Sequence, residues 1–404
     1  MGDREQETIA VKALGDIGEV AAQAWDACAG DQNPFVSHAF LAALEASGSV
    51  SPQAGWAPHH LILEDANDDL VGAVPMYLKG HSYGEFVFDH AWAAAYERAG
   101  GRYYPKLLVA VPFTPVTGPR LLVRPGTDSD SIESYLLAGC VELARRLEVS
   151  SLNINFPNKA LWRRLGEAGL LLRTGEQFHW RNDGYETFDD FLAALSARKR
   201  KTIRRERRDA LADDGITIEV ATGTDLREAH WDAFYAFYMD TGGRKWGSPY
   251  LNRKFFSLIG ETMGERIALI MAKRAGRYIA GALNLIGLDA LYGRYWGCAE
   301  DHPFLHFELC YYQAIDFAIA YGLARVEAGA QGPHKLQRGY TPVHTYSAHW
   351  IRDRGFHEAL ANYLEREREE VDLEIGWLSE RTPFRKADMT DTDRGGRAED
   401  EPTY

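Results

Sequence analysis

The densest run of chemically active side chains in this sequence is EAGAQGPHKLQRGYTPVHTY, residues 327–346. Its glycines break it into turns, and the strand expected before it carries Glu327 near its C-terminal end. A fixed ammonium or guanidinium stabilises the oxyanion that forms when an amine attacks a carbonyl, and Lys335 or Arg338 is suited to this. The alternative is a polar loop with no chemical role. The groups expected to contact a substrate here are His334, Arg338, Tyr340 and His344.

A second run, GRYWGCAEDHPFLHFELC at residues 293–310, should form a strand and then a helix that Asp301 caps. An amine that attacks a carbonyl must lose a proton, and a carboxylate or imidazole in a closed cleft can have its pKa tuned toward neutrality. The candidate bases are therefore Glu308, Glu327 and His306. Glu308 could instead satisfy backbone donors at the start of the helix.

The strand within this second run carries aromatic side chains that alternate in direction. Half of them should enter the core and half should line a cleft, so Tyr295 and Trp296 are candidate substrate contacts. His302 and His306 are four residues apart, a spacing that would allow a metal pair on a helix. No third ligand is evident, and we expect no metal.

The segment SARKRKTIRRERRDAL, residues 196–211, concentrates positive charge in a chain whose formal net charge is −13. We expect one helix from about Phe188, with Phe188, Phe191 and Ile203 among the apolar residues on one face and basic residues over the rest. One reading is a solvated surface helix. The other is a clamp for ligand phosphates, which arginine binds by charge-assisted bonds. Its members would be Lys199, Arg200, Lys201, Arg204, Arg205, Arg207 and Arg208.

The composition is that of a globular protein, with 46% hydrophobic and 25% charged residues. The sequence has no run of 18 or more apolar residues, so we expect no membrane span. The N-terminus lacks the pattern of a signal peptide. The four scattered cysteines fit a reducing compartment, so we expect a cytoplasmic protein. The negative net charge argues against a DNA-binding role but leaves room for one phosphate-bearing ligand on a local basic strip.

The pattern of helices, antiparallel strands, helix, strand and helix occurs twice along the chain, which predicts an α+β fold of two similar modules. The echo between LVGAVPMYL and IAGALNLIG supports this weakly. Strands are expected with turns at Ala275-Gly276 and near Gly287. We place the first module at residues 1–185, the second at 186–382 and a disordered acidic tail at 383–404.

Several long motifs in order, FDDFLAALSARKRKTIRRERRDAL, GRYWGC, HFELCYYQAIDFAIAYGL and EAGAQGPHKLQRGYTPVHTYSAHW, resemble a bacterial family of predicted N-acyltransferases. NPFVSHAFLAAL and VPFTPVTGPRLL fit the same family. That family is related to the Fem peptidoglycan-bridge aminoacyltransferases and, more distantly, to the GNAT acetyltransferases. The resemblance covers roughly residues 30–375.

The resemblance implies a tandem of two GNAT-like modules, each a mixed, mainly antiparallel sheet flanked by helices. It implies an enzyme that transfers an acyl group, from acetyl-coenzyme A or a similar donor, to an amine on a small molecule or a cell-wall precursor. Lys335 matches the lysine of a Phe-Lys motif in the Fem enzymes, with His334 in place of the aromatic residue. The phosphate-binding glycine turn of GNAT enzymes is absent after GRYWGC, which puts coenzyme A in doubt. The alternatives are an aminoacyl-transfer RNA donor and a non-catalytic protein that binds cell-wall precursors.

Overall fold

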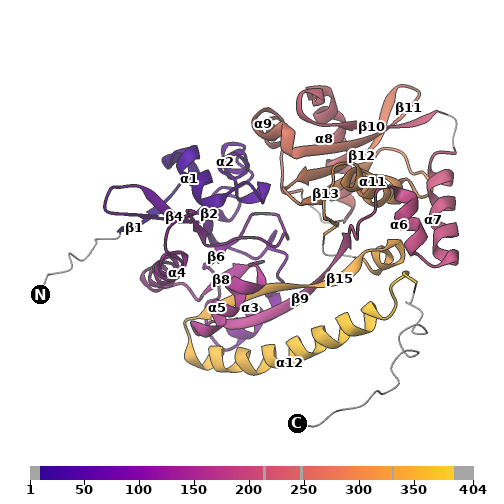
Figure 1. Cartoon of the computed structure of the whole chain (residues 1–404). Helices are drawn as coiled ribbons and strands as arrows, with labels where there is room; N and C mark the ends of the chain where they lie inside the picture. Colours follow the sequence, from indigo (N-terminus) through magenta and orange to yellow (C-terminus); the bar gives the residue numbers. More distant parts are fainter. Residues whose placement is uncertain (1–9, 213–214, 246–248, 330–331, 386–404) are drawn as a thin grey trace, which may run out of the picture.

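The computed structural model describes residues 10–212, 215–245, 249–329 and 332–385, and within them the strands form two sheets (Figure 1). The smaller sheet has the order β1-β3-β4-β7, and the larger has the order β10-β11-β12-β13-β14-β9-β15-β8-β6-β5-β2. The strand bounds are β1 (Ala10–Leu14), β2 (Trp56–Pro58), β3 (His60–Glu64), β4 (Leu70–Val74), β5 (Met76–Lys79), β6 (Lys106–Val109), β7 (Leu122–Val123), β8 (Ser151–Asn155), β9 (Leu171–Arg181), β10 (Ile216–Ala221), β11 (Ile267–Arg274), β12 (Arg277–Ile286), β13 (Ala290–Cys298), β14 (Arg325–Glu327) and β15 (Thr341–Ile351).

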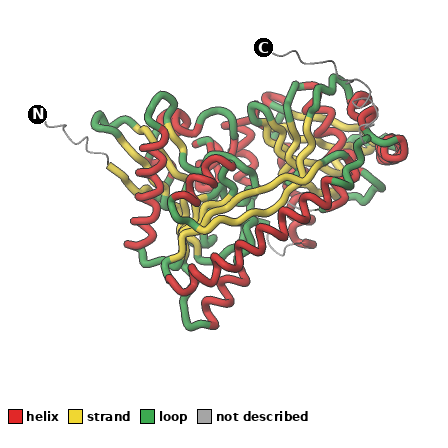
Figure 2. The backbone as a smooth tube through the Cα atoms, turned by 60° about the horizontal axis from the view of Figure 1, so that its bottom comes forward, coloured by secondary structure: helices red, strands yellow, loops and turns green. Residues whose placement is uncertain are grey.

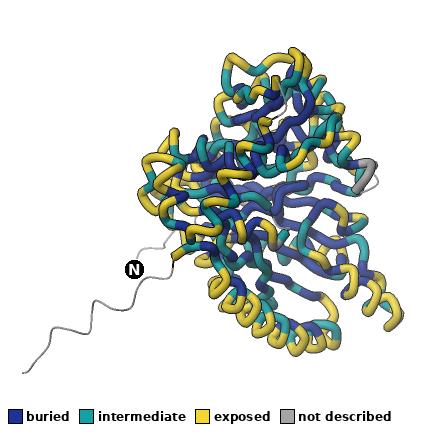
Figure 3. The backbone as a smooth tube through the Cα atoms, turned by 90° about the vertical axis from the view of Figure 1, so that its right-hand side faces the viewer, coloured by how far each residue is buried: buried dark blue, intermediate teal, exposed yellow. Residues whose placement is uncertain are grey.

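Helices cover both faces of the large sheet, whose strands are buried through the middle of the molecule (Figure 3). Their bounds are α1 (Ala22–Ala29), α2 (His38–Ala46), α3 (His90–Arg98), α4 (Ser129–Arg146), α5 (Lys159–Glu167), α6 (Phe188–Ala194), α7 (Ala197–Ala210), α8 (Glu228–Lys245), α9 (Arg253–Met263), α10 (Leu305–Phe307), α11 (Gln313–Ala320) and α12 (Arg354–Ser379). A π-helix (Glu308–Tyr312) joins α10 to α11, and a 3₁₀ helix, η6 (Pro333–Arg338), follows β14.

The three strands expected in the second half are confirmed as β11, β12 and β13. Ala275 and Gly276, both at positive φ, form the tight turn between β11 and β12, as the right-handed twist of a hairpin favours. Apolar side chains on one face of these strands pack against α8 and α9, and those on the other face of β13 and β14 pack against α11.

A parallel pair of strands that parts after three residues occurs once in each half of the chain. β13 and β14 pair from Ala290–Arg325 to Tyr292–Glu327, after which β14 ends and β13 continues, paired only with β12. β6 and β8 pair in the same parallel sense from Leu107 and end their pairing at Val109. Both halves are therefore mixed α+β units with the same central arrangement, as the repeated element order predicted.

The two halves are joined by two long strands, β9 and β15, which pair with each other along their length. β9 follows β8 in sequence but also pairs with β14, whereas β15 follows β14 and also pairs with β8. Each half thus contributes a strand to the other half's side of the sheet, and α12 lies along both strands (Figures 1 and 2).

The single helix expected from about Phe188 is wrong, because the structure has two helices, α6 and α7. Leu195 is extended between them and forms an isolated bridge with Phe384, and Ser196 starts α7. The pairing with Phe384 takes the backbone of Leu195 out of the helical conformation. Residues 386–404 of the expected tail lie outside the described residues.

Asp301 does not cap the next helix, since α10 begins at Leu305 after Phe304 in the left-handed region.

Candidate active site

The point where β13 and β14 part brings together two of the predicted site residues, Glu327 and Lys335. The chain turns away from the sheet after Glu327, and η6 returns Lys335 to the gap. Lys335 Nζ donates hydrogen bonds to the backbone oxygens of Ala328, at 2.6 Å, and Gly329, at 2.8 Å. The side chain is buried, and burial lowers the pKa of Lys335 to about 7. A cation that carbonyls hold in place at this position could stabilise a developing oxyanion.

Glu327, the last residue of β14, is buried and only partly satisfied. Its Oε1 accepts from Arg325 Nε at 2.9 Å, whereas its buried Oε2 accepts no hydrogen bond from any described residue. His179 on β9 lies directly across from Glu327, with 3.7 Å between its Nε2 and Glu327 Oε2. Sequence reasoning missed His179 and its neighbour Gln177. The alternation in QFHWR puts both on one face, but nothing local shows that β9 lies next to β14.

A loop of the first half, residues 110–119, covers this face of the sheet. Gln177 Nε2 donates to the backbone oxygen of Pro115 at 2.6 Å. Arg294 and Tyr295 on β13 both donate to the backbone oxygen of Phe113, and the Phe113 ring stacks on Tyr250 at 4.8 Å. Tyr295, predicted to contact a substrate, thus fastens the loop that roofs the site. The segment VPFTPVTGPR, which forms most of this loop, lies at the junction of the two halves.

Three predicted residues, His306, His334 and Trp296, gather on the α11 side of the gap. The His306 ring lies 5.1 Å from Trp296 and 5.5 Å from Tyr311. His334 Nε2 shares a hydrogen bond of 2.8 Å with the Tyr311 hydroxyl. Tyr340 is fully buried beneath them, 5.4 Å from the Tyr311 ring, so it supports this cluster rather than facing solvent.

Glu308 is held in a buried ion pair. It accepts from Arg207 Nη2 at 2.9 Å, from Arg207 Nε at 3.2 Å and from Gln313 at 2.8 Å, and its side chain is 0% exposed. Arg207 also donates to Asp316 at 2.6 Å. A carboxylate that is bound on both oxygens and shut off from solvent is poorly placed to receive a proton from a substrate.

Arg338 forms a second buried ion pair, with Glu206 of α7, the helix that also carries Arg207. Its Nη2 donates to both carboxylate oxygens of Glu206 at 3.0 Å, and Tyr312 donates to the same carboxylate. Arg338 also lies over the Phe307 ring at 3.4 Å. These contacts tie α7 to the π-helix and to η6, so Arg338 and Arg207 both serve to place the basic helix beside the site.

The remaining basic residues of α7 divide into two groups. Lys199 donates to Gln337, Arg204 pairs with Asp189 at 2.8 Å, and Arg208 pairs with Asp209 at 2.8 Å. Within the part of the chain that is described, no polar partner engages the side chains of Arg198, Arg200, Lys201 or Arg205.

His344 lies away from this site. It is on β15 and shares a hydrogen bond of 2.7 Å with Asp372 on α12, on the far side of the strand pair. The structure therefore does not bring His344 together with Glu327 and Lys335.

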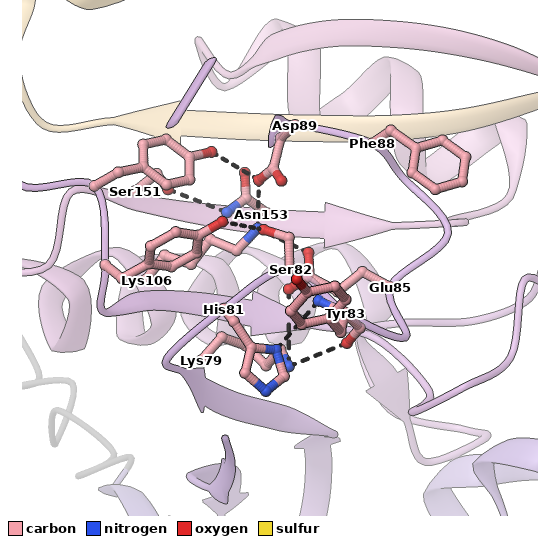
Figure 4. A network of polar contacts seen from close by, with 12 residues as sticks. Lys79, His81, Ser82, Tyr83, Glu85, Phe88, Asp89, Lys106, Ser151 and Asn153 are labelled. Carbon is pink, nitrogen blue, oxygen red and sulfur yellow. Dashed lines mark hydrogen bonds and ion pairs between the residues drawn. The ribbon is translucent and has the colours of Figure 1, made fainter. Parts of the chain in front are cut away.

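A buried network of charged residues anchors the loop 80–89 of the first half (Figure 4). Lys106 Nζ donates to Ser82 Oγ at 2.8 Å and to Glu85 at 2.7 Å, and it also pairs with Asp89. The loop in turn meets the roof of the site, because Phe113 N donates to the backbone oxygen of Gly84 at 3.1 Å. The network therefore fixes the roof from behind.

A cavity of about 1020 Å³ lies elsewhere. It opens between the first half, at Asp31 and Asn33, and the second half, at Arg227 and Arg266, and none of the predicted site residues lines it. The gap between β13 and β14 is the better candidate, because two predicted site residues, Glu327 and Lys335, are buried there. Among the described residues, no three metal-ligating side chains lie together, and no helix is long and apolar enough to cross a membrane.

Comparison with known proteins identifies the family and supports the fold. Residues 16–386 match the FemAB-like family, described as peptidoglycan biosynthesis/recognition. The crystal structure of FemX aligns over 87% of this chain and 100% of its own, with a TM-score of 0.53 and 12% identity. The C-terminal domain of a putative lysylphosphatidylglycerol synthetase from Agrobacterium fabrum aligns over 87% of this chain and 97% of its own, with a TM-score of 0.53 and 10% identity. A search of curated protein sequences finds no match. The expected fold, two GNAT-like modules in tandem, is confirmed.

Proposed function

Because the chain belongs to the FemAB-like family, we propose that it is a transferase that moves an acyl or aminoacyl group onto an amine of a peptidoglycan precursor. The observation that carries this proposal is the gap between β13 and β14. There the buried carboxylate of Glu327 ends β14, and the buried Lys335 binds the two backbone oxygens that follow it, under a roof from the other half. We also propose that it acts in the cytoplasm, in keeping with its few and scattered cysteines.

The residues of the gap suit the addition of an amine to a carbonyl. The amine would approach on the face that the loop 110–119 covers, and its nitrogen would bond to the carbonyl carbon as the bond to the leaving sulfur or oxygen breaks. Lys335 would stabilise the oxyanion. Glu327 would attract the ammonium that forms, because its Oε2 is buried and accepts no hydrogen bond from the described residues. Glu327 is favoured over Glu308 as the carboxylate of the site, since Arg207 holds Glu308.

The second half is favoured over the first as the reacting half. In the first half, Arg120 fills the place where β6 and β8 part, and it donates to the backbone oxygens of Asn155 at 2.7 Å and Val116 at 2.6 Å. A bridge between Gly118 and Pro157 closes the gap beyond it. Arg120 thus occupies the parting of the first half, whereas the parting of the second half holds the buried Glu327, whose Oε2 accepts no hydrogen bond from the described residues.

Two donors are candidates: a coenzyme A thioester and an aminoacyl-transfer RNA ester. Both carry phosphates, which the exposed basic residues of α7, Arg198, Lys201 and Arg205, could bind. The segment between β13 and α10 carries Glu300 and Asp301 in place of a glycine turn, and these acids would repel a pyrophosphate. That feature favours the RNA donor.

Calorimetric titration with acetyl-coenzyme A, at low and moderate salt, tests the thioester donor. Micromolar binding that Lys201→Glu with Arg205→Glu weakens would establish it. A gel shift with charged transfer RNA tests the other donor, and a complex that weakens as salt rises is expected. If neither donor binds, the transferase proposal fails and the binding protein becomes the better account.

A further inference from the structure

The strand that the first half contributes to the second half places a histidine at the proposed reaction centre. Along β9, Gln177, His179 and Arg181 share one face, and Phe178 and Trp180 enter the core on the other. His179 is the direct cross-strand partner of Glu327, so the two side chains lie on the same face. The loop 110–119 covers this face through Gln177.

The groups around His179 indicate which of its ring nitrogens carries the proton. Its Nε2 lies 3.4 Å from Gln177 Oε1 and 3.7 Å from Glu327 Oε2. Exchanging the Oε1 and Nε2 positions of Gln177 would break a hydrogen bond, because Nε2 donates to the Pro115 backbone oxygen at 2.6 Å. Both neighbours of His179 Nε2 are therefore acceptors, and the ring proton belongs on Nε2. Both distances are longer than a full hydrogen bond, as is common before a substrate closes a site.

Burial favours the neutral form of His179. Burial lowers the pKa of His179; Glu327 on β14 opposes this, and Arg325, Arg181 and Lys335 add to it. A neutral imidazole with its proton on Nε2 presents a lone pair at Nδ1. An adjoining carboxylate that holds one ring nitrogen and stabilises the imidazolium is the arrangement by which histidine serves as a base.

We propose that His179 is the general base of the transfer, with Glu327 as its positioning residue. The amine nitrogen bonds to the carbonyl carbon, the proton of the resulting ammonium moves to His179 Nδ1, and the carbon–sulfur or carbon–oxygen bond of the donor breaks. The imidazolium then gives its proton to the leaving thiolate or alkoxide, which restores the enzyme. The inference rests on the proposed function, and it makes the reacting centre a joint product of both halves of the chain.

The tautomer of His179 is tested first, by nuclear magnetic resonance on the full-length protein labelled with ¹⁵N at histidine. His179→Gln identifies the signal. We expect a neutral ring with the proton on Nε2 at pH 7.5, and a midpoint of protonation below that of free histidine. In Glu327→Gln the midpoint should fall further, because the carboxylate that favours the charged ring is gone. A proton on Nδ1, or a charged ring at pH 7.5, overturns the proposal.

Kinetics supply the second test, with acetyl-coenzyme A or alanyl-transfer RNA as donor and a peptidoglycan pentapeptide that carries a free lysine amine as acceptor. His179→Gln should lower kcat by about 100-fold or more, leave KM within a few-fold and remove the acidic limb of the pH profile. His357→Gln, on α12, is the matched control and should keep wild-type rates. An unchanged kcat in a folded His179→Gln protein overturns the base role. If the wild type turns over neither donor, the proposed function fails by itself, while the tautomer still decides whether this imidazole is arranged as a base.

Discussion

Removal of the Glu308 carboxylate should lower the stability of the folded protein far more than it lowers the rate of transfer. Loss of one partner from a buried ion pair costs about 3–5 kcal/mol when the other charge is left alone. In Glu308→Ala, Arg207 keeps Asp316 at 2.6 Å and is 24% exposed, so its charge is not stranded. We therefore expect a loss of about 2–3 kcal/mol, which lowers the melting temperature by about 4–12 °C at roughly 2–4 °C per kcal/mol.

The assay is thermal unfolding followed by circular dichroism, with transfer activity measured well below the transition. Asp316→Asn is the milder control, because Asp316 is 35% exposed, and it should cost less than about 1 kcal/mol. The double variant Arg207→Met with Glu308→Met should recover much of the loss, because apolar side chains of similar size need no charged partner. An unchanged melting temperature together with abolished transfer would refute this reasoning and make Glu308 the base.

Three further outcomes follow from the geometry. Burial lowers the pKa of Lys335 to about 7, so between about pH 7 and 10 the unfolded chain binds a proton that the folded chain lacks. The wild-type protein therefore becomes more stable as the pH rises through this range. Lys335→Met lacks this gain, so its melting temperature relative to that of the wild type should fall from pH 7 to pH 9. Gly297→Ala should destabilise by about 1–3 kcal/mol in urea unfolding, because its Cβ would lie 2.3 Å from the Phe237 backbone oxygen. Lys201→Glu with Arg205→Glu should leave the melting temperature unchanged but reduce the salt dependence of donor binding, and equal salt slopes would return α7 to an inert surface.

Local signals in the sequence identified the elements that local rules govern. The strands β11 to β13 were predicted because Ala275 and Gly276 mark a hairpin turn and the residues between turns are apolar. The position of Glu327 at the C-terminal end of a strand was predicted, because a short apolar run comes before it and glycines follow it. These features depend on residues within about ten positions of one another.

Features that depend on distant residues were missed. The break between α6 and α7 arises because Leu195 pairs with Phe384, far along the chain. The partnership of Glu308 with Arg207 joins two segments that the sequence analysis assigned separate chemical roles. His179 was overlooked for the same reason, since its role comes from β14, which its own neighbours in sequence do not reveal.

The exchange of β9 and β15 has a consequence for folding during synthesis on the ribosome. β8 and β9 are synthesised early, but one edge of each remains unpaired until residues 341–351 have been made. At ~5–20 residues per second, that wait lasts on the order of ten seconds or more. An open strand edge is a template for pairing with another chain, so the nascent first half should depend on chaperones or on slow collapse during this interval. A chain released before residue 351 should aggregate rather than persist as a folded half.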